Sequence, residues 1–88
     1  MSKAYKFNDK ELEVLGKLHT AVEKIHEEGK SIETVTTLAA IEVATETMTM
    51  IDTIAVFLCA GLYGCEAENP EFKELRLRLE KHFNMKGI

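Results

Sequence analysis

The sequence has few of the residues from which most functional motifs are built. Its 88 residues include no tryptophan, one proline and two cysteines. Cys59 and Cys65 are six positions apart and lack the paired spacing of a zinc or redox site, so we expect reduced, structural thiols. The sequence also has no glycine-rich phosphate loop and no recognisable nucleophile motif. It therefore predicts a non-catalytic protein without a cofactor.

Hydrophobic runs long enough to cross a membrane are missing as well. The longest uncharged stretch, residues 53–65, has 13 residues, whereas a spanning helix needs roughly 20. The first residues lack the apolar segment of a secretion signal. We expect one domain over residues 1–88, a cytoplasmic location and no membrane partner.

Positive charge is absent from the middle of the chain. Residues 31–72 carry seven acids and no lysine, arginine or histidine, so all 11 lysines and arginines lie in the two flanking segments. The net charge of −4 argues against binding to duplex nucleic acid. The apolar share of 45% excludes intrinsic disorder. Because the lysines and arginines are all concentrated in the two end segments, a small anionic ligand remains compatible with the chain.

Three helix-start signals are present. Asn8 and Glu11 have the spacing of a capping box before an amphipathic stretch. Ser31 caps a second stretch that nothing interrupts until the glycines at 61 and 64. Asn69 followed by Pro70 begins a third. These signals predict an all-α fold, a helical hairpin with a long central helix plus a short C-terminal helix, with helices over residues 9–28, 32–62 and 70–83.

The predicted central helix is long for so short a chain. Its 31 residues would span roughly 46 Å, at about 1.5 Å per residue. A compact globule of 88 residues has a diameter of roughly 31 Å. Such a helix either kinks in its threonine-rich middle or extends beyond the monomer and is covered by other copies. We therefore expect a homo-oligomeric bundle that shares this helix as its core.

One short motif raises the question of a metal site. Glu23 and His26 have the Glu-x-x-His spacing of di-iron helical bundles, and His19 lies on the same flank. Glu42 and Glu46 sit one turn apart on the next helix. The full constellation needs a second Glu-x-x-His motif, which the sequence lacks, so we expect no metal.

Basic residues recur at intervals that place them on one side of a helix. Lysines seven residues apart form a row on the first helix, an aromatic residue precedes that row, and a second cluster lies on the last helix. Such a row of lysines has two interpretations. It binds the phosphate of a ligand whose base stacks on the aromatic ring, or it is simply a helix face exposed to solvent. The residues concerned are Lys10, Lys17, Lys24, Tyr5, Arg76, Arg78 and Lys81.

The start of the first helix resembles a family of phage proteins. Residues 5–18, Tyr-Lys-Phe-Asn-Asp-Lys-Glu-Leu-Glu-Val-Leu-Gly-Lys-Leu, are similar to the helical-hairpin start of phage anti-CBASS sponges. The resemblance implies a small all-α protein that forms hexamers and sequesters cyclic di- and trinucleotide immune signals without cleaving them. It also implies that Tyr5 stacks on a base and that Lys17 or His19 contacts a phosphate.

The sequence departs from that family's pattern at several positions. Tyr5 lies one residue closer to the helix than the pattern expects, and His19 stands at the position of the family's basic residue. Ala4 stands where the family has glycine, and the arginine expected early in the second helix is absent. Arg76 or Arg78 from another chain would then have to replace that arginine.

Two functions remain as alternatives. The first is a phage-type binding protein that sequesters a small phosphorylated ligand, a cyclic di- or trinucleotide, between subunits in the host cytoplasm. It requires the basic residues to converge, and its predicted contacts are Tyr5, Lys17, His19, Lys24, Arg76 and Arg78. The second is a small acidic inhibitor of a host protein, of anti-CRISPR, immunity or anti-sigma type. It requires exposed acids, namely Glu33, Glu42, Glu46 and Asp52.

Overall fold

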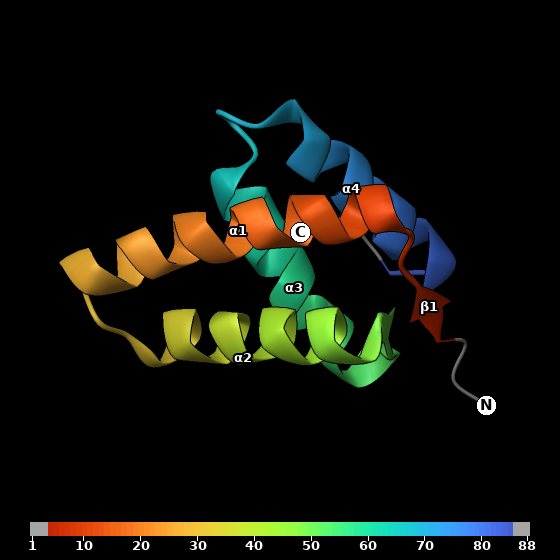
Figure 1. The fold of residues 1–88 in the computed structure, drawn as a ribbon, viewed down its shortest axis with the longest axis horizontal. Helices are drawn as coiled ribbons and strands as arrows, with labels where there is room; N and C mark the ends of the chain where they lie inside the picture. The colour runs from red at the N-terminus through yellow and green to blue at the C-terminus, as the bar shows by residue number, and fades with distance from the viewer. Residues whose placement is uncertain (1–3, 86–88) are drawn as a thin grey trace.

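Residues 4–85 are described by a computed structural model, and most of them are helical. In Figure 1, α1 and α2 run side by side as a hairpin, α3 crosses behind them, and α4 packs against α3. The all-α prediction is confirmed, apart from a pair of short antiparallel strands. The elements are β1 (Tyr5–Lys6), α1 (Asp9–Glu28), α2 (Ile32–Thr47), β2 (Thr49–Met50), α3 (Asp52–Cys65) and α4 (Pro70–His82).

The helix starts read from the sequence are confirmed. Asn8 Oδ1 accepts a hydrogen bond from the Glu11 amide at 2.8 Å, and the Asn8 amide donates to the Glu11 carboxylate at 3.1 Å. This reciprocal pair is a capping box. Ser31 Oγ caps α2 by accepting from the Thr34 amide at 3.2 Å. Pro70 is the first residue of α4, where its missing amide hydrogen costs nothing.

The prediction of one continuous helix over residues 32–62 is wrong. Met48 has a left-handed backbone, with φ at 61° and ψ at 17°, which ends α2. The Thr47 hydroxyl accepts a hydrogen bond from the Thr49 amide at 3.3 Å, so this amide has an acceptor although the helix has ended. The break falls in the threonine-rich middle, where threonine hydroxyls compete with helical hydrogen bonds.

A distant segment of the chain explains why the helix breaks. Tyr5 pairs with Met50 and Lys6 with Thr49 in the two-stranded sheet, and the Phe7 amide donates to the Met48 carbonyl at 2.9 Å. The reversal folds α3 back onto α2 and buries the Met50 side chain. These contacts link residues more than forty positions apart, so local helix propensity carries no sign of them.

The break removes the length argument for assembly. The longest helix, α1, has 20 residues, and the described molecule measures 38 × 26 × 23 Å. A monomer of this shape holds all its helices, so no helix has to be shared. The homo-oligomer therefore stays a prediction without its original basis.

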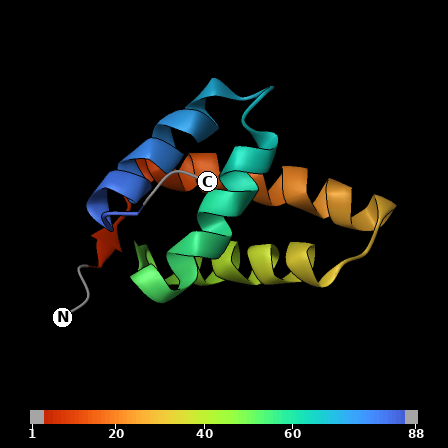
Figure 2. The same ribbon diagram turned by 180° about the vertical axis from the view of Figure 1, so that it is seen from behind.

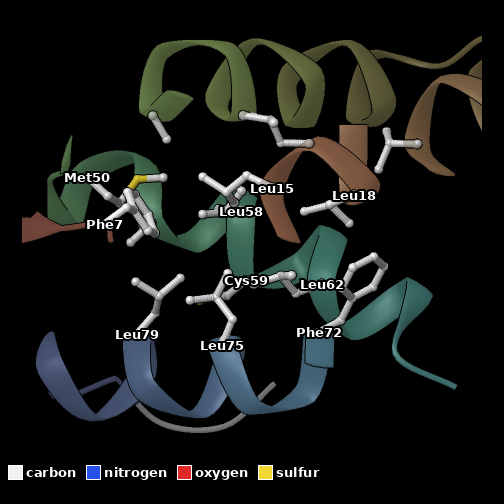
Figure 3. Close-up of a cluster of buried hydrophobic side chains, with 14 residues drawn as sticks. Phe7, Leu15, Leu18, Met50, Leu58, Cys59, Leu62, Phe72, Leu75 and Leu79 are labelled. Carbon is white, nitrogen blue, oxygen red and sulfur yellow. The ribbon is translucent and has the colours of Figure 1, made fainter. Parts of the chain in front are cut away.

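The core is organised around α3. Figure 3 shows Leu58, Cys59 and Leu62 of α3 between the side chains of α1 and those of α4. Phe7 and Met50 close the core beside the two strands. Burying each large apolar side chain stabilises the fold by roughly 1.5–3 kcal/mol. The flanking core residues labelled in Figure 3 are Leu15, Leu18, Phe72, Leu75 and Leu79. Within residues 4–85, no helix combines the length and hydropathy needed to span a membrane.

Candidate functional site

Tyr5 and Arg78, two of the six predicted ligand contacts, meet on one carboxylate. The Tyr5 hydroxyl donates to Glu11 Oε2, and Arg78 Nη1 donates to the same oxygen at 3.2 Å. Burial, followed by the bond to Glu11, raises the pKa of Tyr5 to about 12. The Tyr5 ring lies edge-on to the rings of Phe7 and His82, with centroids 5.1 Å away in each case. Both the ring and the hydroxyl of Tyr5 are therefore engaged within the protein.

Arg76 lies in a separate, buried network. Its Nε donates to Glu66 at 2.7 Å and its Nη1 to Glu80 at 2.9 Å, and the side chain is about one-tenth exposed. The guanidinium also lies 5.3 Å from the centre of the Tyr63 ring. The hydrogen bond to Glu66, more than any other interaction, raises the pKa of Arg76 above its usual range. Arg76 fastens α4 to the end of α3, which is a structural role.

Lys17 and His19 on α1 also have acidic partners. Lys17 Nζ lies 3.4 Å from Glu71 in an exposed ion pair, a kind worth no more than about 1 kcal/mol. His19 lies between Glu23 and Glu42, with a ring nitrogen 3.1 Å from each carboxylate. The His19 ring thus joins α1 to α2.

The remaining predicted contact, Lys24, lies apart from the others. It lines a hollow of about 400 Å³ together with Glu28 and Glu68. The six predicted contacts are therefore spread over separate clusters of the monomer, and only Tyr5 and Arg78 share a partner.

Of the residues considered for a metal site, the structure brings His19, Glu23 and Glu42 together but engages His26 elsewhere. His26 Nδ1 lies 2.6 Å from the Thr34 hydroxyl, whereas Glu23 pairs with His19. Among residues 4–85, no three histidine, cysteine or acidic side chains are arranged to hold a metal ion.

The four acids named for the second function are all exposed: Glu33, Glu42, Glu46 and Asp52. Exposed apolar side chains accompany them on α2, where Ile32 is 85% exposed, Val35 52% and Val43 47%. Helical spacing places most of these residues opposite the buried side of α2. We call this surface the α2 face, and it consists of Ile32, Val35, Ala39, Glu42, Val43 and Glu46.

The apolar part of the α2 face corrects the sequence analysis, which placed this helix in a shared core. The core side of α2 is instead made of smaller residues, with Ala40 and Ala44 buried beside Ile41. Small residues let α1 and α3 approach closely on that side and leave the valines outside. Periodicity alone could not choose between the two sides, because both are apolar.

A groove lies where α3 crosses the end of the α1–α2 hairpin. It has a volume of about 450 Å³, and Glu33 is the charged residue in its lining. Ile25, Gly64 and Cys65 also line the adjoining hollow that contains Lys24, Glu28 and Glu68, so the two depressions are continuous. The sequence signal for this groove is the uncharged stretch 53–65 with its small residues. The groove is lined mainly by Ile25, Ile32, Phe57, Ala60, Gly61 and Gly64.

Comparison with known proteins assigns neither a family nor a function to the chain. No protein-family model, no curated protein and no solved structure matches the chain. The resemblance to anti-CBASS sponges stays a hypothesis, and the function has to be argued from the geometry.

Proposed function

We propose that the protein is a non-catalytic binding protein that docks a basic partner protein on the α2 face. The observation that carries this proposal is the exposure of Glu42 and Glu46 beside Val35 and Val43. The whole of α2 contains no basic residue, so its acidic charge is not balanced within the helix. The fitting partner presents lysine or arginine around one or two apolar side chains.

The two kinds of residue on the α2 face have different tasks in such a complex. Apolar surface contributes about 25 cal/mol for each Å² that binding removes from water. The acids attract and orient a basic partner, which increases the association rate and selects against acidic competitors. A solvated acidic helix would need no row of exposed Ile32, Val35 and Val43, so the apolar residues favour binding over simple solubility.

The cyclic-nucleotide hypothesis has less support from the geometry. Arg76 and Arg78 already bind carboxylates, and the Tyr5 ring is packed against two other rings. Freeing these groups would leave Glu11 or the Glu66 carboxylate without its cation, which is costly where the acid is buried. Sequestration of a cyclic nucleotide stays a prediction, tested below.

A pair of designed peptides tests the proposal. Both carry the same leucine stripe on a helix, one with lysine and the other with glutamate on the flanks, and fluorescence anisotropy reports binding. We expect the lysine peptide to bind at least tenfold more tightly, and its affinity to fall with added salt. Equal affinity for the two peptides would contradict the proposal.

Matched charge reversals locate the surface. The double variant Glu42→Lys/Glu46→Lys should lose most of the binding to the lysine peptide. The variant Glu13→Lys/Glu27→Lys changes the net charge equally on the exposed side of α1 and should retain binding. An equal loss in both variants would mean that net charge, and not the α2 face, attracts the peptide.

A further inference from the structure

The outward side of α4 carries an apolar side chain with a lysine on each side of it and one acid, Glu74, next to the first lysine. Leu77 is 49% exposed, although it is a large apolar residue. Lys73 and Lys81 lie one turn before and one turn after it and are both exposed. We call these three residues the α4 ridge. The two lysines are about 12 Å apart along the helix axis.

The groove beside α3 has the opposite arrangement of charge. Its centre is apolar, with Phe57 and Ala60 in the lining, and Glu33 lies on the side formed by α2. The adjoining hollow carries Glu28 and Glu68 against one lysine. An apolar centre with acids on both sides is complementary to an apolar residue with a lysine on both sides.

The α3 side of the groove has room for a side chain. Gly64 is exposed, and a Cβ atom added to it would meet nothing within 4 Å. Ala60 is exposed one turn earlier on the same helix. A volume of about 450 Å³ is several times that of a leucine side chain, so Leu77 of another molecule fits without displacing the walls.

The ridge and the groove of one molecule cannot meet. Leu58 and Leu62 of α3 face the core with α4, whereas Phe57, Ala60 and Gly64 lie on the other side of α3. Leu77 in turn lies on the side of α4 away from the core. Figures 1 and 2 both show α4 at the other end of the molecule from the α1–α2 loop.

We propose that the α4 ridge of one copy docks in the groove of a second copy, so that the protein associates head to tail. The complementary charges and the apolar contact are both supplied by this chain, which makes a second copy the occupant that fits. Each copy keeps one unused ridge or groove, so the contact is heterologous and generates a ring or an open chain. Of the α2 face, this contact uses only Ile32, at its end, and not Glu42, Val43 or Glu46. The proposal therefore goes beyond the binding function above.

Two single variants and their mixture test the contact. Gly64→Trp fills the groove, and Leu77→Glu reverses the ridge; both positions are exposed, so the fold is retained. Analytical ultracentrifugation of the unaltered protein should show a mass that rises with concentration and falls with added salt. Each variant alone should stay monomeric under conditions where the unaltered protein associates.

The mixture of the two variants gives the decisive result. Leu77→Glu still has an intact groove and Gly64→Trp an intact ridge, so an equimolar mixture should form a 1:1 dimer and nothing larger. A monomeric mixture would contradict a head-to-tail contact, as would an unaltered protein that stays monomeric at about 1 mM. A symmetric dimer lost only in Gly64→Trp would assign the groove to a different contact and overturn the proposal.

A third variant separates this proposal from the function proposed above. Val43→Lys removes an apolar side chain from the α2 face, adds a positive charge there and leaves the ridge and the groove intact. It should weaken binding of the lysine peptide and leave self-association unchanged, whereas Leu77→Glu should weaken self-association and leave peptide binding unchanged. Loss of self-association in Val43→Lys would place the contact on the α2 face and contradict the head-to-tail arrangement.

Discussion

Tyr5 shows how a residue chosen for ligand chemistry serves the fold. Its hydroxyl and Arg78 satisfy Glu11, which is only 5% exposed and which also caps α1. Buried carboxylates without such partners are strongly destabilising. The capping role of Glu11 can be predicted from its spacing to Asn8. Its hydrogen bonds from Tyr5 in β1 and Arg78 in α4 cannot be predicted this way, because they depend on the tertiary fold.

Replacing the hydroxyl tests this arrangement. Tyr5→Phe should lower the free energy of unfolding by about 1–2 kcal/mol, because a charged acceptor loses one donor. Urea titration measures the loss. Tyr63→Phe is the matched control, since half of Tyr63 is exposed and no loss is expected there. Equal effects of the two changes would mean that the Tyr5 bond contributes nothing specific.

The raised pKa of Tyr5 gives a prediction about alkaline unfolding. The folded state holds the phenol proton more tightly than the unfolded state, whose pKa is near 10, so this contribution is complete below pH 10. It should be lost as the pH rises from 10 to about 12. The unaltered protein should therefore lose more stability over this interval than Tyr5→Phe, measured by urea titration at each pH. Parallel curves for the two proteins would contradict the shift.

Arg76 is the basic residue whose loss we expect to cost most. Arg76→Ala leaves Glu66 and Glu80 facing each other with little solvent, and should destabilise the fold by about 3–5 kcal/mol. Lys17→Ala removes an exposed pair instead and should cost less than about 1 kcal/mol. Thermal unfolding of both variants compares them. Similar losses would show that the Arg76 network is no stronger than a surface pair.

At the scale of elements, the contact between α2 and α3 depends on a missing side chain. A Cβ atom on Gly61 would lie 2.6 Å from Cγ2 of the buried Thr37, whereas one on Gly64 would meet nothing. Both glycines lie in α3, where replacing glycine by alanine gains up to about 1 kcal/mol of helix propensity.

The two alanine variants should therefore differ in sign. Gly64→Ala should stabilise the protein by up to about 1 kcal/mol, and Gly61→Ala should destabilise it, since overpacking typically costs about 1–3 kcal/mol. Chemical denaturation of the pair measures the difference. If both variants were stabilised, the close packing of Thr37 against α3 would be refuted.

The helix boundaries show how far local sequence reaches. The start of each predicted helix was readable because its cap lies within three residues of it, as with Asn8 and Ser31. The break at Met48 was not, because it depends on pairing between β2 and the strand that precedes α1. The candidate site depends on long-range placement of this kind. The absence of nearby bases left the α2 acids either exposed or buried against a cation from another helix, and the groove requires three helices to be placed together.

At the scale of the whole molecule, the acids of the middle segment divide into a group paired with basic residues and a group exposed to solvent. Several of its acids bind the basic flanks, as Glu66 does with Arg76 and Glu71 with Lys17. The acids of α2 are left mostly to solvent, next to apolar residues. The net charge of −4 does not distinguish the paired acids from the exposed ones. Only the exposed acids are available to contact a partner protein.

A thermal-shift panel tests the competing hypothesis directly. With the arginines and Tyr5 engaged internally, we expect cyclic di- and trinucleotides at about 1 mM to leave the midpoint of unfolding unchanged. A ligand at 100 times its dissociation constant would add about 2.7 kcal/mol of stability, which is easily detected. A clear shift that Tyr5→Ala abolished would restore the sponge hypothesis.

The most direct test of docking on the α2 face is a chemical-shift map of ¹⁵N-labelled protein titrated with the lysine-flanked helical peptide. Docking there predicts that the largest shifts fall on α2, around Val35, Glu42, Val43 and Glu46, and that the glutamate-flanked peptide produces none. Shifts centred on Tyr5 and Arg78, or no shifts with either peptide, would contradict it.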